Sequence, residues 1–299
     1  MTIPSFLWTF TGIHNVRLSG PAPMELAADV FLYGPDKRLL AAPTQMDLNQ
    51  RHLADHRAMG CFLVHKKICS TIHAREWDGY KGKLQDVLMS MQIVKPLRTS
   101  GFIYQCTETN DQISPPFSGE LRSPMEPGQW PQLRPFDEAF LKEAPGVAAR
   151  VERVMSGGSP ELKNSIYLFQ LALEHHHPAI ACVLAVSSME AALETSTATR
   201  FEKELCLALG TETRAFPNWN EPLYPQPSHT VGELAFPLHK LRSKIVHGAD
   251  LREATDKNHR PINFGELRTF IQERADPTYM QLLCESSICL AAQVLKKRL

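Results

Sequence analysis

The feature that most constrains the fold is a change in the spacing of apolar residues about halfway along the chain. From residue 136 onward, apolar side chains recur at the three- and four-residue spacings of helices, and strand-like alternation largely disappears. The helices expected in this half cover residues 136–154, 161–174, 178–194, 198–209, 231–246, 263–275 and 276–299. Residues 136–299 are therefore predicted to form an all-α bundle.

The first 135 residues carry a different pattern, in which short strand-like stretches alternate with proline and glycine. Strands are expected at residues 6–10, 29–33, 61–64 and 101–106, with one helix at residues 83–94. A proline-rich stretch from residue 113 to residue 135 lacks apolar periodicity, as domain boundaries do. The predicted fold class is therefore α+β, with an N-terminal mixed α/β domain of unknown role (residues 1–135) before the helical domain (residues 136–299).

Composition limits the classes of protein to which the chain can belong. The chain has 43% hydrophobic and 21% charged residues, which is typical of a globular protein. Lysine and arginine together number 32, as do aspartate and glutamate, so any nucleic-acid site must be local and not a broad basic surface. Because we find no membrane-length apolar run, no secretory signal and no Cys-x-x-Cys pair, we expect a cytoplasmic protein with reduced thiols.

The segment Leu238 to Gly248 reads Leu-His-Lys-Leu-Arg-Ser-Lys-Ile-Val-His-Gly and carries the strongest chemical signal. Arg242 and His247 would point about 140° apart on a regular helix, but they can converge if the helix ends just before Gly248. Pro237 is expected to disturb the first turns of this helix. At the helix end, the dipole favours a protonated His247, and proton transfer by His247 with positive charge from Arg242 suits metal-independent RNA cleavage.

The arrangement of Arg242, four intervening residues, His247 and Gly248 resembles the Arg-x4–6-His signature of HEPN domains, and it looks closest to the Apea-like branch. A second match is the stretch Met-Glu-Ala-Ala-Leu that contains Glu190. The resemblance covers about residues 136–299. It implies an Apea-like, HEPN-like helical bundle that forms a homodimer and cleaves RNA, often in prokaryotic toxin or antiviral defence systems.

The resemblance also implies a role for each matching residue. Arg242 and His247 would be the catalytic pair, facing their counterparts across the dimer interface, with no cofactor and no metal. Ser243 takes a position where the family commonly has Asn, Asp or His, and Glu190 would orient Arg242 or His247. The same residues also fit a non-catalytic HEPN module that dimerises or binds a partner or a nucleotide, and the N-terminal domain is a candidate sensor of an unidentified ligand or protein.

Other chemistry-bearing residues have simpler interpretations. His175, His176 and His177 precede Pro178 in an expected turn between helices, where solvated histidines are common. A second group consists of His52, His56, Cys61, His65 and Cys69, and its spacing fits no recognised zinc site. A thiol hydrolase could use Cys61 or Cys69, but no oxyanion or orienting motif accompanies them.

The N-terminal aromatic residues alternate at strand spacing and have no basic neighbours in the sequence. They are Phe6, Trp8, Phe10, Phe31 and Tyr33. This spacing favours a hydrophobic core over a surface on which nucleic-acid bases stack.

Overall fold

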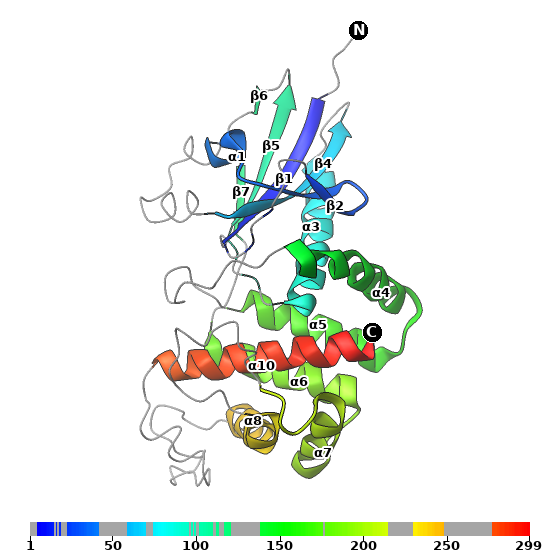
Figure 1. Ribbon diagram of the computed structural model, residues 1–299, viewed down its shortest axis with the longest axis vertical. Helices are drawn as coiled ribbons and strands as arrows, with labels where there is room; N and C mark the ends of the chain where they lie inside the picture. The colour runs from blue at the N-terminus through cyan, green and yellow to red at the C-terminus, as the bar shows by residue number, and fades with distance from the viewer. Residues whose placement is uncertain are drawn as a thin grey trace. The chain divides into compact units, whose positions relative to one another are not determined.

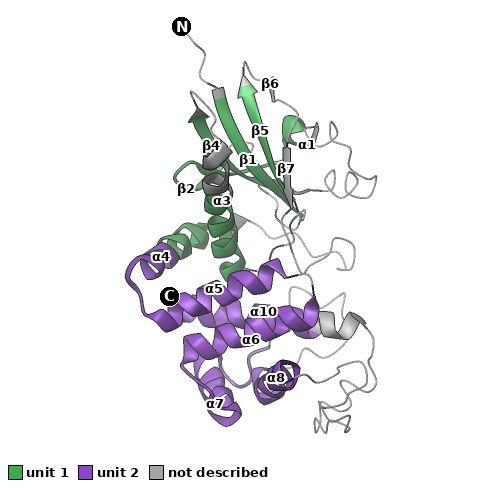
Figure 2. Cartoon of the chain, turned by 180° about the vertical axis from the view of Figure 1, so that it is seen from behind, with its two compact units in different colours: residues 1–150 green, residues 151–299 purple. Residues whose placement is uncertain are grey.

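The chain folds into two compact units, residues 1–150 (unit 1) and 151–299 (unit 2), as Figure 2 shows. This division lies inside a helix, whereas the proline-rich stretch of the sequence places a boundary at residues 135/136. The computed structural model describes residues 5–14, 16, 18, 23–41, 59–69, 74–95, 97, 99, 102–109, 112–113, 117–120, 138–175, 177–214, 230–247 and 277–299.

Unit 1 is built on an antiparallel sheet. Its described strands are β1 (Ser5–Ile13), β2 (Met24–Ala27), β3 (Val30–Tyr33), β4 (Cys61–Cys69), β5 (Phe102–Thr109), β6 (Gln112–Ile113) and β7 (Phe117–Glu120). They are arranged in the order β2-β3-β4-β1-β5-β6, and β7 also pairs with β5 (Figure 1). The four predicted strands are confirmed. The strand β7 was not predicted, because it lies within the proline-rich stretch that we expected to be a connecting segment.

Helices accompany the sheet in unit 1. They are α1 (Lys37–Ala41), α3 (Ala74–Val94) and the 3-10 helix η2 (Glu138–Glu143). α3 packs against β1 and β4, and buries the apolar face predicted for it, including Leu84, Leu88 and Met91. The helix begins at Ala74, before the predicted start at residue 83. The prediction missed the first turns because residues 74–82 lack clear apolar periodicity.

One buried cluster of the sheet contains most of the N-terminal aromatic residues. Trp8 and Phe10 are fully buried in it, and Phe6 and Tyr33 pack against it. The prediction of a core is therefore confirmed for these four residues, whereas Phe31 is partly exposed and lies outside the cluster. The expected lack of basic neighbours is wrong in three dimensions. Arg38 Cζ and Lys66 Nζ, which are distant from Trp8 in the sequence, lie 5.4 and 4.6 Å from the centroid of its ring.

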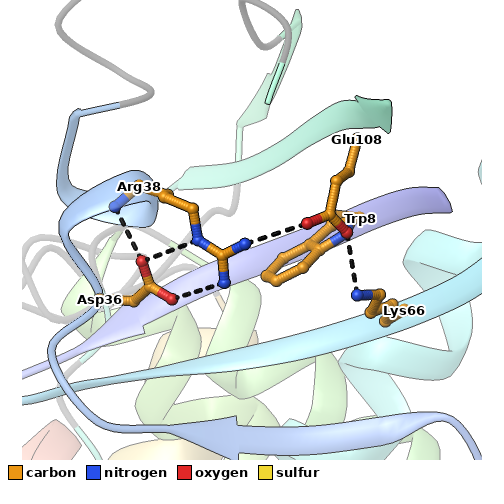
Figure 3. Close-up of polar contacts among 5 residues, drawn as sticks. All are labelled: Trp8, Asp36, Arg38, Lys66 and Glu108. Atoms are coloured by element: carbon orange, nitrogen blue, oxygen red, sulfur yellow. Dashed lines mark hydrogen bonds and ion pairs between the residues drawn. The ribbon is translucent and has the colours of Figure 1, made fainter. Parts of the chain in front are cut away.

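These cations belong to a charge network around the Trp8 indole (Figure 3). Glu108 is buried and accepts a 2.9 Å hydrogen bond from Trp8 Nε1. It also pairs with Arg38 at 3.0 Å and Lys66 at 2.9 Å, while Asp36 holds the other side of the Arg38 guanidinium. These three donors offset the cost of burying the Glu108 carboxylate. The residues of the network lie on β1, β4, β5 and α1, which it therefore links.

The regular elements described in unit 2 are all helices, and an isolated β-bridge pairs Arg214 with Thr230. The helices from the unit boundary onward are α4 (Ala144–Gly157), which crosses that boundary, α5 (Pro160–Glu174), α6 (Pro178–Leu193), α7 (Ala198–Leu209), α8 (Val231–Val246) and α10 (Pro277–Arg298). The bounds of α5 to α8 agree with the predicted ones to within one residue. The predicted helix at residues 263–275 lies outside the described residues.

α6 is the central helix of unit 2, as its small and apolar sequence predicts. It packs against α5, α10, α8 and α7, and α5, α6 and α10 run side by side in Figure 1. The chain as a whole therefore has an α+β architecture, a sheet followed by helices. None of the described helices is long and apolar enough to cross a membrane alone, and α6 and α7 satisfy that criterion only as a pair bent by 75°.

Candidate functional site

α8 has well-defined ends that follow from its sequence. Thr230 is the N-cap and forms a capping box with Glu233, in which each side chain binds the other residue's backbone N–H. Pro237 lies inside the helix, and the expected disturbance is absent, since α8 continues through it to Val246. His247 is the C-cap residue, as the sequence predicted when it placed the helix end just before Gly248, which itself lies outside the described residues.

Glu190 on α6 links the two helices. It is only 8% exposed, and Oε2 forms an ion pair with Arg242 Nη2 at 3.2 Å while Oε1 lies 2.9 Å from His239 Nε2. The predicted partnership of Glu190 with Arg242 is therefore present. His239 was not predicted as a site residue.

The contact between His239 and Glu190 is close but not aligned. Neither ring nitrogen of His239 makes a hydrogen bond of good geometry within the described part of the chain, although Nε2 is 2.9 Å from the carboxylate oxygen. The oxygen therefore lies away from the axis of the ring N–H. On its other side the imidazole packs against the buried Phe201 of α7, with ring centroids 5.6 Å apart.

Arg242 is anchored to α6 through two different nitrogens. Nη2 pairs with Glu190, and Nε donates a 3.4 Å hydrogen bond to Ser187 Oγ. Within the described ranges no contact involves Nη1, and the side chain remains 31% exposed. The guanidinium is thus held along one edge, and Nη1 remains free to donate a hydrogen bond to a ligand.

Burial determines the protonation of the two groups beside Arg242. Burial raises the pKa of Glu190, and the Arg242 charge opposes that shift. Burial lowers the pKa of His239, and the charges of Arg242 and Lys240 lower it further. A neutral imidazole is therefore favoured at neutral pH, which leaves the carboxylate opposite a single cation.

The other two predicted residues lie apart from this contact. His247 is exposed, and its backbone N–H donates to the Ser243 carbonyl at 3.1 Å to close the last turn. No contact between the side chains of Arg242 and His247 is found over the described residues, so their convergence stays a prediction. Ser243 is partly exposed and makes no side-chain hydrogen bond there either.

The remaining candidate groups carry no such arrangement. His175 and His177 are the caps that end α5 and begin α6, which confirms the turn, and His176 lies outside the described residues. The described part of the chain holds no group of three or more potential metal ligands. His52 and His56 lie outside that part.

The described cysteines are free thiols. Burial raises the pKa of Cys182 to about 11 and that of Cys106 to about 12, which makes both poor nucleophiles. Burial also raises the pKa of Cys61, one of the two thiols weighed for hydrolase chemistry. A nucleophilic role for Cys61 has no support in its surroundings.

No protein-family model, curated protein or solved structure matches this chain. The resemblance in α6 and α8 therefore depends on the residues and contacts described above.

Proposed function

We propose that the end of α8 is half of a HEPN-type, metal-independent endoribonuclease centre, and that a second copy of the chain completes it in a homodimer. The observation that carries this proposal is the anchoring of Arg242 by Glu190 and Ser187, which leaves its side chain 31% exposed. An arginine fixed before substrate binds is preorganised to stabilise negative charge that develops on a phosphate.

His247 supplies the proton transfer in this proposal. Cleavage requires that the 2′-hydroxyl of RNA lose a proton as its oxygen attacks the adjacent phosphorus, and that the departing 5′ oxygen gain one. The products are a 2′,3′-cyclic phosphate and a free 5′-hydroxyl. Because Arg242 is tied to α6 and His247 is exposed at the helix end, we infer that Arg242 of one subunit works with His247 of the other.

The charge of α8 supports an anionic substrate. Between Leu234 and His247 the helix contains Lys240, Arg242 and Lys244 and no acidic residue. The chain carries no net charge, so this cationic stretch is a local feature. It matches the local RNA site that the composition requires, with Ser243 at its centre as a supporting polar residue.

The cellular setting proposed here is a prokaryotic toxin or antiviral defence system in the cytoplasm. Unit 1 would then recognise the signal that triggers cleavage, either a small ligand or a protein. Its Glu108 network orders one region of the sheet, which is compatible with a rigid recognition domain.

An RNA cleavage assay tests the proposal. Purified full-length protein, incubated with total RNA in the presence of EDTA, should yield fragments ending in 2′,3′-cyclic phosphate. His247→Ala and Arg242→Ala should abolish cleavage, whereas His177→Ala, which changes an exposed histidine in the α5–α6 turn, should not. Intact RNA with the wild-type protein, or equal cleavage by His247→Ala, would refute the nuclease.

The second candidate is a non-catalytic module that dimerises or binds a partner or nucleotide. It is favoured by the exposed apolar side chains on α8, Phe236 at 39% and Val246 at 56%. In this case Arg242→Ala and Val246→Asp should weaken self-association in analytical ultracentrifugation, and no preparation should cleave RNA. Cleavage by the wild-type protein would exclude this candidate.

A further inference from the structure

We propose that His239, which lies outside the Arg242–His247 pattern, is a positioning residue that fixes the Arg242 guanidinium through Glu190. The consequence for RNA cleavage rests on the proposed function, whereas the positioning itself does not. His239 touches neither RNA nor the reacting atoms in this proposal.

Helical spacing places His239 where it can act on the same carboxylate as Arg242. The two residues are three positions apart on α8, so they share a face, and that face is turned toward Glu190 on α6. Each uses a different carboxylate oxygen, Oε1 for His239 and Oε2 for Arg242. The carboxylate is therefore in close contact at both oxygens, and a rotation away from Arg242 would also move Oε1 away from the imidazole.

The surroundings of His239 limit the movement of the imidazole. It is 7% exposed, and Phe201 packs against the ring from α7. Arg242 is also bound by Ser187, three residues before Glu190 on α6. The guanidinium of Arg242 on α8 thus contacts two residues of α6, and Phe201 of α7 packs against the imidazole that lies beside one of them.

Packing alone does not explain a histidine at this position. Both ring nitrogens of His239 are buried and neither makes a hydrogen bond over the described residues, which is unfavourable compared with an apolar side chain. Its neighbours Leu238 and Leu241 are fully apolar and buried. The imidazole makes one close polar contact there, and that contact is with the carboxylate that holds Arg242.

Two variants separate positioning from packing. His239→Leu keeps the volume approximately and removes the polar contact, whereas His239→Gln restores an amide N–H at a comparable reach. In the full-length protein, His239→Leu should lower kcat for RNA cleavage by about tenfold to a hundredfold, with KM changed less than about threefold, because misplacing a charge-stabilising group acts on the transition state. His239→Gln should recover part of kcat.

A second measurement reports on Arg242 without any need for RNA cleavage. In ¹⁵N-labelled protein, the Arg242 Nε–H signal, assigned by its absence in Arg242→Lys, should be sharp in the wild type and in His239→Gln. It should broaden or shift in His239→Leu. In a Glu190→Gln background, His239→Leu should cause no further change, since the effect passes through Glu190. The matched control His177→Leu should alter neither the signal nor kcat.

The outcomes distinguish this inference from the proposed function. If wild-type protein leaves RNA intact but the Arg242 signal responds as described, the nuclease is wrong and the positioning role stands. If the wild type cleaves RNA and His239→Leu, folded by circular dichroism, retains both kcat and the Arg242 signal, the positioning role is wrong. An equal loss in His239→Leu and His239→Gln, or one that persists without Glu190, also overturns it.

Discussion

Glu190 is the residue on which the contact between α6 and α8 depends most. Its carboxylate is 8% exposed and faces both Arg242 and His239, so removing its charge leaves Arg242 without its ionic partner. Because Arg242 is partly exposed, water compensates some of this loss. Glu190→Gln should therefore lower the free energy of unfolding by about 1–3 kcal/mol, measured by urea denaturation. A variant as stable as the wild type would show that the pair contributes nothing.

Protonation of His239 should make stability depend on pH. Burial, with Arg242 and Lys240, lowers its pKa in the folded chain below the ordinary value of 6.5, so below that pH the unfolded chain binds a proton that the folded chain resists. This contribution to stability is complete above about pH 6.5 and declines as the pH falls. The raised pKa of Glu190 acts in the opposite direction, because a proton on its carboxyl group favours the folded chain.

A comparison of variants isolates the histidine. Between about pH 7.5 and about pH 5.5, the wild type should lose up to about 1.4 kcal/mol more unfolding free energy than His239→Gln. Urea denaturation at both pH values measures the difference. Parallel pH profiles would show that His239 titrates as it does in the unfolded chain.

The sequence identified part of this site. Glu190 and Arg242 were recognised from short patterns, and their contact is one that the resemblance implied. Ser243 and His247 stay predictions of that resemblance. His239 was not predicted as a site residue. Its three-residue spacing from Arg242 was a usable signal, because it places both side chains on the same face of α8. The hydrogen bond from Arg242 to Ser187 depends on how α6 and α8 pack against each other, which a short sequence pattern does not predict.

At the scale of elements, α8 shows why helix ends in unit 2 were predictable. Thr230 and Glu233 satisfy backbone groups of the first turn reciprocally, and His247 follows the last turn. Thr230→Ala removes the cap and should lower stability by about 1 kcal/mol, whereas Thr230→Ser keeps the hydroxyl and should cost less. Thermal or urea denaturation of the two variants provides the measurement, and identical losses would argue against the capping role.

Short elements were less predictable than long ones. β2, β6 and β7 have four, two and four residues, and none of the three was predicted. Their strand conformation depends on pairing with β3 and β5, which neighbouring residues in the sequence do not specify. The Glu108 network was missed for the same reason, since its members come from separate segments.

At the scale of the whole molecule, charge predicts how RNA binding responds to salt. The chain is neutral overall, and the proposed RNA site draws on three cations near the end of α8, Lys240, Arg242 and Lys244. The logarithm of the affinity for single-stranded RNA should fall with the logarithm of salt concentration with a slope of about −2, at about 0.7 per phosphate contact. Lys240→Ala should make this slope shallower by about 0.7 in fluorescence anisotropy titrations. A slope much steeper than −2, unchanged by Lys240→Ala, would place the RNA elsewhere.

Arg242 and His247 are proposed to act across two subunits, and mixing two inactive variants tests this arrangement. Arg242→Ala and His247→Ala should each fail to cleave RNA alone. Co-refolded in equal amounts, they should recover about a quarter of wild-type activity, because half of the dimers are mixed and each mixed dimer keeps one of two sites intact. A mixture that forms mixed dimers but leaves RNA intact, while the wild type cleaves it, would contradict the shared site.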